Sequence, residues 1–82
     1  MNDIIIKICN ILSKIIKADF PIDYDINKDF VQEYSIDSLN YVKMIVDLEE
    51  EFNVTFNDEV LLTDNLTTLQ SIINIIDKKH NN

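Results

Sequence analysis

The chain has 82 residues, a formal net charge of −8 and an apolar content of 46%. That length allows one domain with one modest core, so residues 1–82 are expected to form a single domain. The chain contains no glycine and a single cysteine, Cys9. This composition excludes glycine-rich phosphate loops, an intrachain disulfide and a cysteine-based zinc cluster. Cys9 is expected to be a small buried apolar residue.

The negative charge is concentrated in one part of the chain. Positions 37 to 64 contain eight acidic residues and one basic residue, Lys43. Such a surface repels nucleic acid and anionic membranes and attracts partners with basic patches. No apolar run is long enough to span a bilayer, and no signal peptide is visible. We therefore expect a cytoplasmic, monomeric protein that binds neither nucleic acid nor membranes. The acidic residues could also serve solubility alone.

The N-terminal segment has the apolar spacing of three and four that is typical of an amphipathic helix, at Ile4, Ile5, Ile8, Ile11, Leu12, Ile15 and Ile16. Asn2 or Asp3 is the expected N-cap, and the helix is expected to end near Ala18, ahead of Pro21. Residues 19–36 show no helical period and predict a long connection. Its apolar side chains are expected to fix it to the core: Phe20, Ile22, Ile26, Phe30 and Val31.

A second helix is predicted from Ser38 to Phe52, with two apolar stripes. The core stripe consists of Tyr41, Met44, Ile45, Leu48 and Phe52. The second stripe lies nearly opposite the core stripe and consists of Leu39, Val42 and Val46, flanked by Glu49 and Glu50. An apolar stripe in an acidic surround indicates a docking face. The alternative is that this stripe packs under the long connection.

Two further helices complete the predicted fold. A short helix is expected from its cap at Asn57, and a last helix has Thr67 as N-cap and Gln70 at the third position. The inner face of the last helix is predicted from its spacing: Leu69, Ile72, Ile73 and Ile76. His80 is expected to begin a frayed tail. The fold class is all-α, a small four-helix bundle of three longer helices and one short helix, with a long loop between helices 1 and 2.

The segment Ile36-Asp37-Ser38-Leu39 places a hydroxyl at the start of the second helix. Backbone N–H groups there lack partners within the helix, which makes a helix start favourable for an anion. A phosphodiester on Ser38 would therefore be tolerated electrostatically. Serine and aspartate are also common N-caps, so a capping role is the structural alternative for both Ser38 and Asp37.

Other chemistries are disfavoured. No nucleophile is paired with a base, so no catalytic residue is assigned and an enzyme is not expected. A calcium loop from Asp25 fails, because Phe30 replaces its required glycine and Ile36 its bidentate glutamate. No resident metal is expected.

Three segments carry a family resemblance over nearly the whole chain. They are Phe30-Val31 ahead of Asp37-Ser38-Leu39, the run Leu48-Glu49-Glu50-Glu51-Phe52, and Leu66-Thr67-Thr68-Leu69-Gln70. In this order of helices, the chain resembles the acyl carrier proteins. The resemblance implies that Ser38 carries covalent 4′-phosphopantetheine and that Asp37 helps place Mg²⁺ when the modifying transferase acts. It also implies a partner-docking set: Leu39, Val42, Val46, Glu49, Glu50, Phe56 and Asp58.

The resemblance implies a non-enzymatic carrier that presents acyl thioesters to partner enzymes of fatty-acid or polyketide-like biosynthesis. The implied partners are a phosphopantetheinyl transferase and acyl-transferring or synthase enzymes with basic docking patches. Three positions depart from the family. Ser35 replaces a common glycine, and Asn40 and Lys43 stand where fatty-acid carriers often have acids. The two changes on the second helix, Asn40 and Lys43, favour a specialised pathway, and Ser35 bears on the conformation of the loop before the site. An aminoacyl or peptidyl carrier and a cofactor-free helical interaction module are the alternatives.

Overall fold

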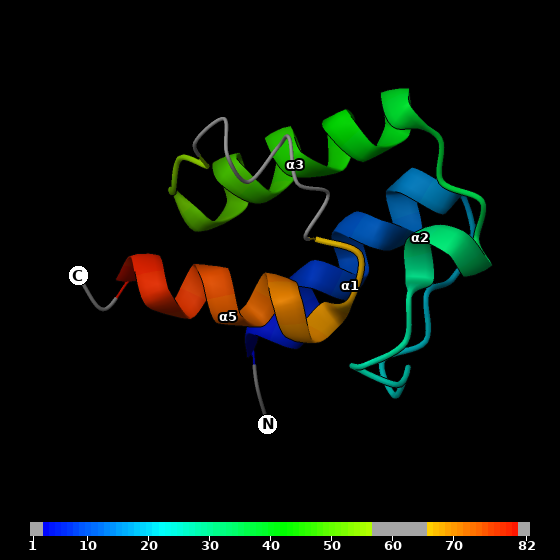
Figure 1. The fold of residues 1–82 in the computed structure, drawn as a ribbon, viewed down its shortest axis with the longest axis horizontal. Helices are drawn as coiled ribbons and strands as arrows, with labels where there is room; N and C mark the ends of the chain where they lie inside the picture. Colours follow the sequence, from blue (N-terminus) through cyan, green and yellow to red (C-terminus); the bar gives the residue numbers. More distant parts are fainter. Residues whose placement is uncertain (1–2, 57–65, 81–82) are drawn as a thin grey trace.

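The computed structural model describes residues 3–56 and 66–80, which contain four helices and no strand (Figure 1). The helices are α1 (Asp3–Ile16), α2 (Phe30–Glu33), α3 (Ser38–Phe52) and α5 (Leu69–His80). The prediction of an all-α fold is confirmed. The short helix predicted from Asn57 and the N-cap candidate Asn2 lie outside the described residues. The assignment of residues 1–82 to one domain stays a prediction.

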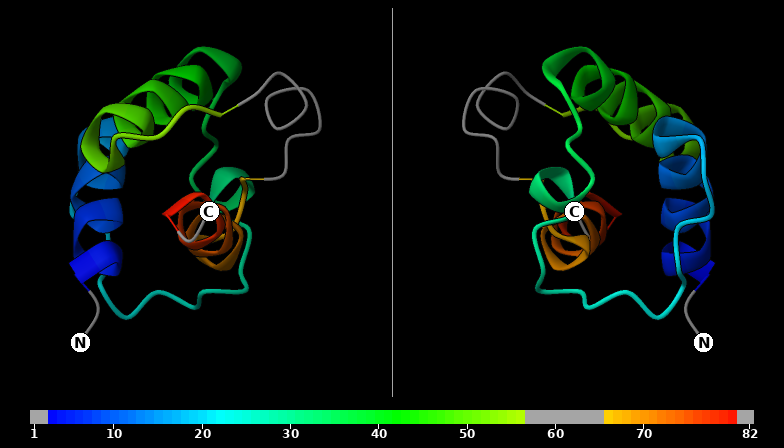
Figure 2. Two further views of the ribbon diagram at one scale, coloured as in Figure 1. Left: turned by 90° about the vertical axis from the view of Figure 1, so that its left-hand side faces the viewer. Right: turned by 90° about the vertical axis from the view of Figure 1, so that its right-hand side faces the viewer.

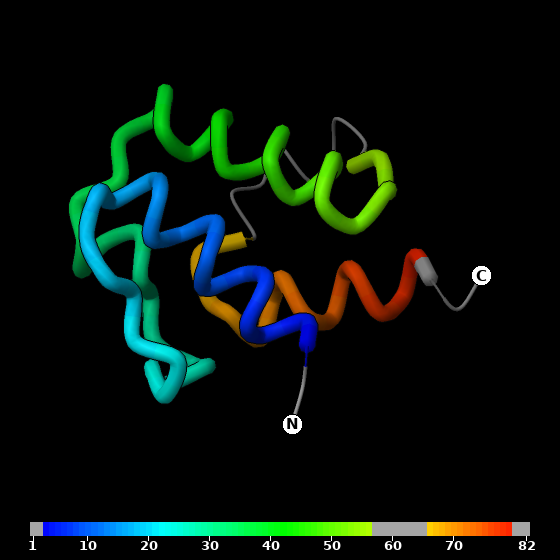
Figure 3. Tube along the Cα trace, turned by 180° about the vertical axis from the view of Figure 1, so that it is seen from behind, coloured from blue at the N-terminus to red at the C-terminus, as the bar shows by residue number. Residues whose placement is uncertain are grey.

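A common apolar core joins α1, α3 and α5, and α1 contacts both of the other helices. The five residues predicted for the core stripe of α3 are all buried. From α1 the core takes Ile8, Cys9, Ile11, Leu12 and Ile15, and from α5 it takes Leu69, Ile72 and Ile76. The trace from behind shows α1 running diagonally, with its C-terminal end towards the chain that leads into α3 (Figure 3). Helical periodicity therefore identified the inward face of each long helix.

Helix ends in this glycine-free chain place ordinary residues in the left-handed region. Among the described residues, φ is positive at Lys17 (57°), Ser35 (52°) and Asn53 (53°). Each lies at or just past the end of a helix. The next residue then donates its N–H to the carbonyl five positions back: Ala18 to Ser13 at 3.2 Å, Ile36 to Val31 at 2.9 Å and Val54 to Glu49 at 3.1 Å. This is the bond of the Schellman motif, which normally uses glycine.

The first helix was predicted to end near Ala18 and ends two residues earlier, at Ile16, because Lys17 takes the left-handed conformation. Lys14 is in the last turn of α1, where a cation favours the negative end of the helix dipole.

The long connection contains a helix that the sequence did not predict. α2 is a single turn capped by Asp29, whose carboxylate accepts a hydrogen bond from the Gln32 N–H at 2.9 Å. The apolar residues predicted to hold the connection are buried or partly buried, with one exception. Ile22 is 52% exposed, so its predicted core role is wrong. It lies in a turn at the surface.

Backbone hydrogen bonds tie this connection to the segment around the start of α5. The Phe30 N–H donates to the Thr67 carbonyl at 3.0 Å, and the Gln70 N–H donates to the Ile26 carbonyl at 2.9 Å. Figure 2 accordingly shows α2 beside the start of α5. The connection is therefore tied to a segment distant in sequence, which explains how it stays ordered.

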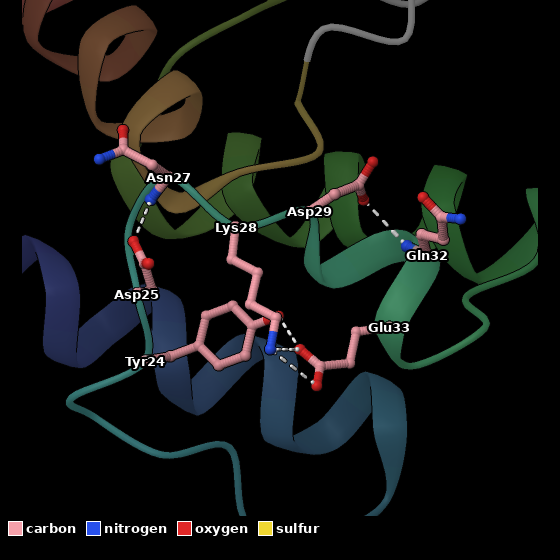
Figure 4. A network of polar contacts seen from close by, with 7 residues as sticks. All are labelled: Tyr24, Asp25, Asn27, Lys28, Asp29, Gln32 and Glu33. Atoms are coloured by element: carbon pink, nitrogen blue, oxygen red, sulfur yellow. Dashed lines mark hydrogen bonds and ion pairs between the residues drawn. The ribbon is translucent and has the colours of Figure 1, made fainter.

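A polar network lies on the outside of the connection (Figure 4). Glu33 accepts hydrogen bonds from the Tyr24 hydroxyl and from Lys28 Nζ, the latter at 3.1 Å. These two bonds hold the pKa of Glu33 below its usual range. Burial raises the pKa of Tyr24, and the bond to Glu33 raises it further. Both shifts favour the pairing of a neutral phenol with an ionised carboxylate at neutral pH.

The cap of the last helix differs from the prediction by one residue. Thr68 Oγ1 accepts a bond from the Ser71 N–H at 3.1 Å, and Ser71 Oγ accepts one from the Thr68 N–H at 3.3 Å. This is a capping box between Thr68 and Ser71. The predicted cap at Thr67 is wrong, because the Thr67 carbonyl is committed to Phe30 and the helix begins at Leu69. The predicted frayed tail at His80 is also wrong in its start, since α5 extends to that residue.

Ser35 provides a test of the glycine-free helix ends. A β-branched residue is strongly disfavoured at positive φ, so Ser35→Val is expected to lower the free energy of unfolding by about 1–2 kcal/mol. Ser35→Gly is expected to be at least as stable as the wild type, since glycine adopts this conformation without steric cost. Urea unfolding followed by circular dichroism measures both variants. Equal stability of the glycine and valine variants would contradict the left-handed assignment.

Candidate functional site

The start of α3 separates the cap from the neighbouring hydroxyl. Asp37 is the N-cap, with an extended backbone, and its Oδ1 accepts a hydrogen bond from the Asn40 N–H at 2.8 Å. Ser38 is the first helical residue and is exposed. Its hydroxyl makes no hydrogen bond to any residue in the described ranges. The interpretation of Ser38 as the cap is therefore wrong, and the hydroxyl is accessible for chemistry.

The surroundings of Ser38 suit a phosphate-linked group. The Ser38 and Leu39 N–H groups belong to the first turn, where no preceding helical carbonyl is available to them. The positive end of the α3 dipole lies at the same place, so negative charge is favoured there. An exposed hydroxyl at this position fits covalent attachment of a phosphodiester.

A pocket of about 320 Å³ opens beside the hydroxyl. Its lining comes from α2, the start of α3 and the segment before α5: Val31, Ile36, Asp37, Ser38, Tyr41, Val42 and Thr67. This volume is at the lower end of the range of small-molecule sites, ~300–1,000 Å³. Tyr41 and Thr67 were not predicted as site residues. Tyr41 follows Ser38 by three residues on α3, so helical spacing could have indicated it. Thr67 has no such local signal, because it is held near the site by the backbone bond from the Phe30 N–H.

The loop ahead of the site contains no glycine but has the left-handed backbone conformation that glycine favours. Ser35 has a φ of 52°, so it takes the left-handed conformation for which the family's glycine is suited. Ser35 and Asn40 also line a second pocket, of about 350 Å³, together with Lys17 at the end of α1. Two of the positions at which the chain departs from the family therefore lie on one side of the candidate site.

The second apolar stripe of α3 is exposed. Leu39 is 79% exposed, Val42 is 55% exposed and Val46 is 45% exposed. The alternative that this stripe packs under the long connection is wrong. Three accessible apolar side chains on one helix face are available to a partner.

Two other predicted docking residues are bound to each other. Glu49 is half-buried, and its Oε2 accepts a hydrogen bond from the Phe56 N–H at 2.8 Å. The Phe56 side chain is 4% exposed. Contact between a partner and the Phe56 ring would therefore require that ring to leave the core. Asp58 lies outside the described residues, and the docking roles of all three residues stay predictions.

Cys9 is buried as predicted, and burial raises the pKa of its thiol. Across residues 3–56 and 66–80, no three His, Cys, Asp or Glu side chains are placed to hold a metal ion. The role of Asp37 towards Mg²⁺ in a transferase complex stays a prediction. None of the described helices has the length and apolar character needed to cross a membrane.

Comparisons with known proteins agree with this geometry. The profile of the family described as "Phosphopantetheine attachment site" matches residues 7–76. The acyl carrier protein of Buchnera aphidicola subsp. Schizaphis graminum is 37% identical over 82 residues, which cover 98% of each chain. No solved structure gives a significant match.

Two shorter alignments involve further acyl carrier proteins. That of Buchnera aphidicola subsp. Baizongia pistaciae is 46% identical over 48 residues, covering 58% of this chain and 59% of the relative. That of Kocuria rhizophila is 36% identical over 52 residues, covering 63% of this chain and 62% of the relative.

The chain therefore belongs to the acyl carrier protein family of phosphopantetheine-binding proteins. Members of this family are carriers and not enzymes, so the prediction of a non-enzymatic protein is confirmed. Its cofactor is covalently attached 4′-phosphopantetheine. The carrier role implies transferase and synthase enzymes as partners in general.

The Asp37 cap can be tested by stability. Asp37→Ala removes the acceptor for the Asn40 N–H and is expected to lower the free energy of unfolding by about 1 kcal/mol. Asp37→Asn is expected to retain most of the stability, because an amide oxygen can also cap. Chemical denaturation measures the change, with the exposed loop variant Asp23→Ala as control. A loss from Asp37→Ala no larger than that of the control would contradict the capping role.

Proposed function

We propose that Ser38 is the attachment point of the 4′-phosphopantetheine arm. The observation that carries this proposal is the division of roles at the start of α3, where Asp37 caps the helix and leaves the Ser38 hydroxyl exposed. When bound, the group supplies a terminal thiol that holds a carboxylic acid as a thioester. The chain itself supplies a rigid base, a favourable potential for the phosphate and an apolar pocket beside it.

Asp37 has a second role in this proposal. Its carboxylate is exposed and directly precedes the acceptor serine. In the complex with the modifying transferase, we propose that it helps to place the Mg²⁺ ion that accompanies CoA. The capping bond uses Oδ1, and a carboxylate has further lone pairs on its second oxygen. The two roles of Asp37 are therefore compatible.

The partner-docking face consists of Leu39, Val42, Val46 and Glu50, all exposed on α3. Partner enzymes would cover the apolar side chains and meet the negative charge with basic residues. The excess of acidic residues in positions 37–64 would speed the encounter with such partners. Of the other residues that the resemblance implies, Phe56 and Asp58 complete this face, whereas the Glu49 carboxylate is bound to the Phe56 N–H.

The cargo that we propose is an acyl chain of fatty-acid or specialised polyketide-like biosynthesis. The names of the three similar relatives support the acyl reading. Asn40 and Lys43 support a specialised pathway, since they reduce the acidity of the docking helix. An aminoacyl or peptidyl carrier remains the second candidate, because the serine chemistry is the same. A cofactor-free interaction module has no support once the family is known.

Attachment can be tested by intact mass. Incubation with CoA, Mg²⁺ and a broad-specificity phosphopantetheinyl transferase is expected to add one phosphopantetheine to the wild type and none to Ser38→Ala. Ser35→Gly, which removes the nearby serine, serves as control and is expected to be loaded like the wild type. Loading of Ser38→Ala, or no loading of the wild type while a control carrier is modified, would overturn the proposal.

The apolar part of the docking face has its own test. The double variant Leu39→Ala, Val42→Ala is expected to lower kcat/KM for transferase loading by about tenfold, because it removes exposed contact area. Stability should change little, since surface substitutions usually stay within about 0.5 kcal/mol. Ile22→Ala removes an exposed apolar residue away from α3 and is the matched control. Equal loading rates of the double variant and the control would contradict this docking face.

A further inference from the structure

The three consecutive glutamates at the end of α3 have different surroundings. Successive helical residues point about 100° apart, so Glu49, Glu50 and Glu51 cannot face the same way. The core-facing side of α3 is occupied by residues such as Leu48 and Phe52. Glu50 lies opposite that side, and its two neighbours lie on the flanks of the helix. The central glutamate is therefore directed away from the core, and it borders a surface hollow that Ile11 and Lys14 of α1 also line.

Glu49 stabilises the turn that follows α3. Its backbone carbonyl accepts hydrogen bonds from the N–H groups of Asn53 and Val54, the latter at 3.1 Å. Its carboxylate accepts the Phe56 N–H at 2.8 Å. Three N–H groups of one turn thus converge on a single residue, and the turn delivers the Phe56 ring to the core. Hydrogen bonds to charged acceptors are stronger than neutral ones, so the carboxylate holds this turn in place.

Glu51 is directed towards α1. Its Oε2 lies 4.0 Å from Lys7 Nζ, and both side chains are partly exposed. Such a surface pair contributes little to stability, but it places a cation beside the Glu51 carboxylate and so reduces the negative potential that Glu51 offers to a partner. Glu50, in contrast, is exposed and forms no ion pair with any residue in the described part of the chain.

Glu50 also continues the exposed apolar stripe. Val42, Val46 and Glu50 follow at intervals of four residues, which places them in one row along α3. Lys43 is exposed on the same side of the helix as Glu50 and lies about two turns nearer to Ser38 than Glu50 does. From the Ser38 end, the row therefore consists of an apolar stretch followed by the exposed carboxylate of Glu50. Lys43 and the half-buried Asp47 lie beside the row.

We propose that, of these three glutamates, partner enzymes bind only Glu50, and that Glu49 and Glu51 instead make contacts within the protein. The inference rests on the proposed function of α3 as the docking helix. The matching surface on the partner is an apolar strip with one basic residue at the end remote from its reactive centre. With a rise of 1.5 Å per residue, that basic residue meets Glu50 ~18 Å along α3 from Ser38. No matching cation is required near Lys43.

Three glutamine variants separate charge from hydrogen bonding: Glu49→Gln, Glu50→Gln and Glu51→Gln. The readout is kcat/KM for loading by the phosphopantetheinyl transferase with CoA, at low and at high salt. Glu50→Gln is expected to lower kcat/KM about fivefold at low salt, with a smaller loss at high salt because salt screens the lost attraction. The other two variants are expected to stay within about twofold of the wild type, since the Glu49 carboxylate is bound to the Phe56 N–H and Glu51 lies on the flank of α3 beside Lys7.

The role of Glu49 is measured independently of any partner by hydrogen exchange at the Phe56 amide. Glu49→Ala is expected to accelerate this exchange by about tenfold or more, whereas Glu49→Gln, which keeps an acceptor oxygen, is expected to retain the protection. Glu50→Ala is the matched control and should leave the Phe56 amide protected.

The outcomes distinguish the two proposals. Absence of wild-type loading would overturn the attachment site and the docking helix together. A different result would overturn only the proposal that partners bind Glu50 selectively. In that result the wild type is loaded normally, but Glu49→Gln or Glu51→Gln slows loading as much as Glu50→Gln does. Unchanged exchange of the Phe56 amide in Glu49→Ala would overturn the structural role of Glu49.

Discussion

The hydrogen bond from the Asn40 N–H to Asp37 determines what the candidate site can do. A helix start needs an acceptor for its free N–H groups, and serine is among the residues that commonly supply one. Because Asp37 supplies it here, at 2.8 Å, the Ser38 side chain is released from that task. The same bond fixes the first turn of α3 and hence the direction in which the Ser38 hydroxyl leaves the helix. Capping by one residue thus makes the next residue available for modification.

The chain that leads to this cap is positioned without glycine. Ser35 adopts the left-handed conformation, and the Ile36 N–H donates a hydrogen bond to the Val31 carbonyl at the end of α2. Bonds from Phe30 to Thr67 and from Gln70 to Ile26 then tie the connection to the start of α5. The pocket beside Ser38 is formed by the segments that these bonds bring together. The site therefore depends on contacts between distant parts of the sequence as much as on its own tripeptide.

Sequence patterns predicted the parts of the structure that depend on local periodicity. The buried and exposed faces of α3 follow from the spacing of its apolar residues, and both were predicted correctly. The errors lie where a tertiary contact competes with a local signal. Thr67 resembles an N-cap, but its carbonyl pairs with Phe30 and the cap moves to Thr68. α2 is one turn long, too short for any period, and depends on Asp29 and on burial of Phe30. The Glu49–Phe56 bond likewise has no sequence signature.

Helix α3 has three different surfaces, because the helical period fixes the angle at which each side chain leaves the helix axis. One face packs on α1 and the core, one end presents Ser38, and the outward row presents apolar side chains and Glu50. Charge along the sequence is consequently a poor measure of charge available to a partner. In the run from Glu49 to Glu51, one carboxylate is used by the Phe56 N–H and another faces Lys7. A substitution in this run is therefore expected to alter folding or recognition according to its angle around the helix, and comparison of carriers by acidic content alone would miss that distinction.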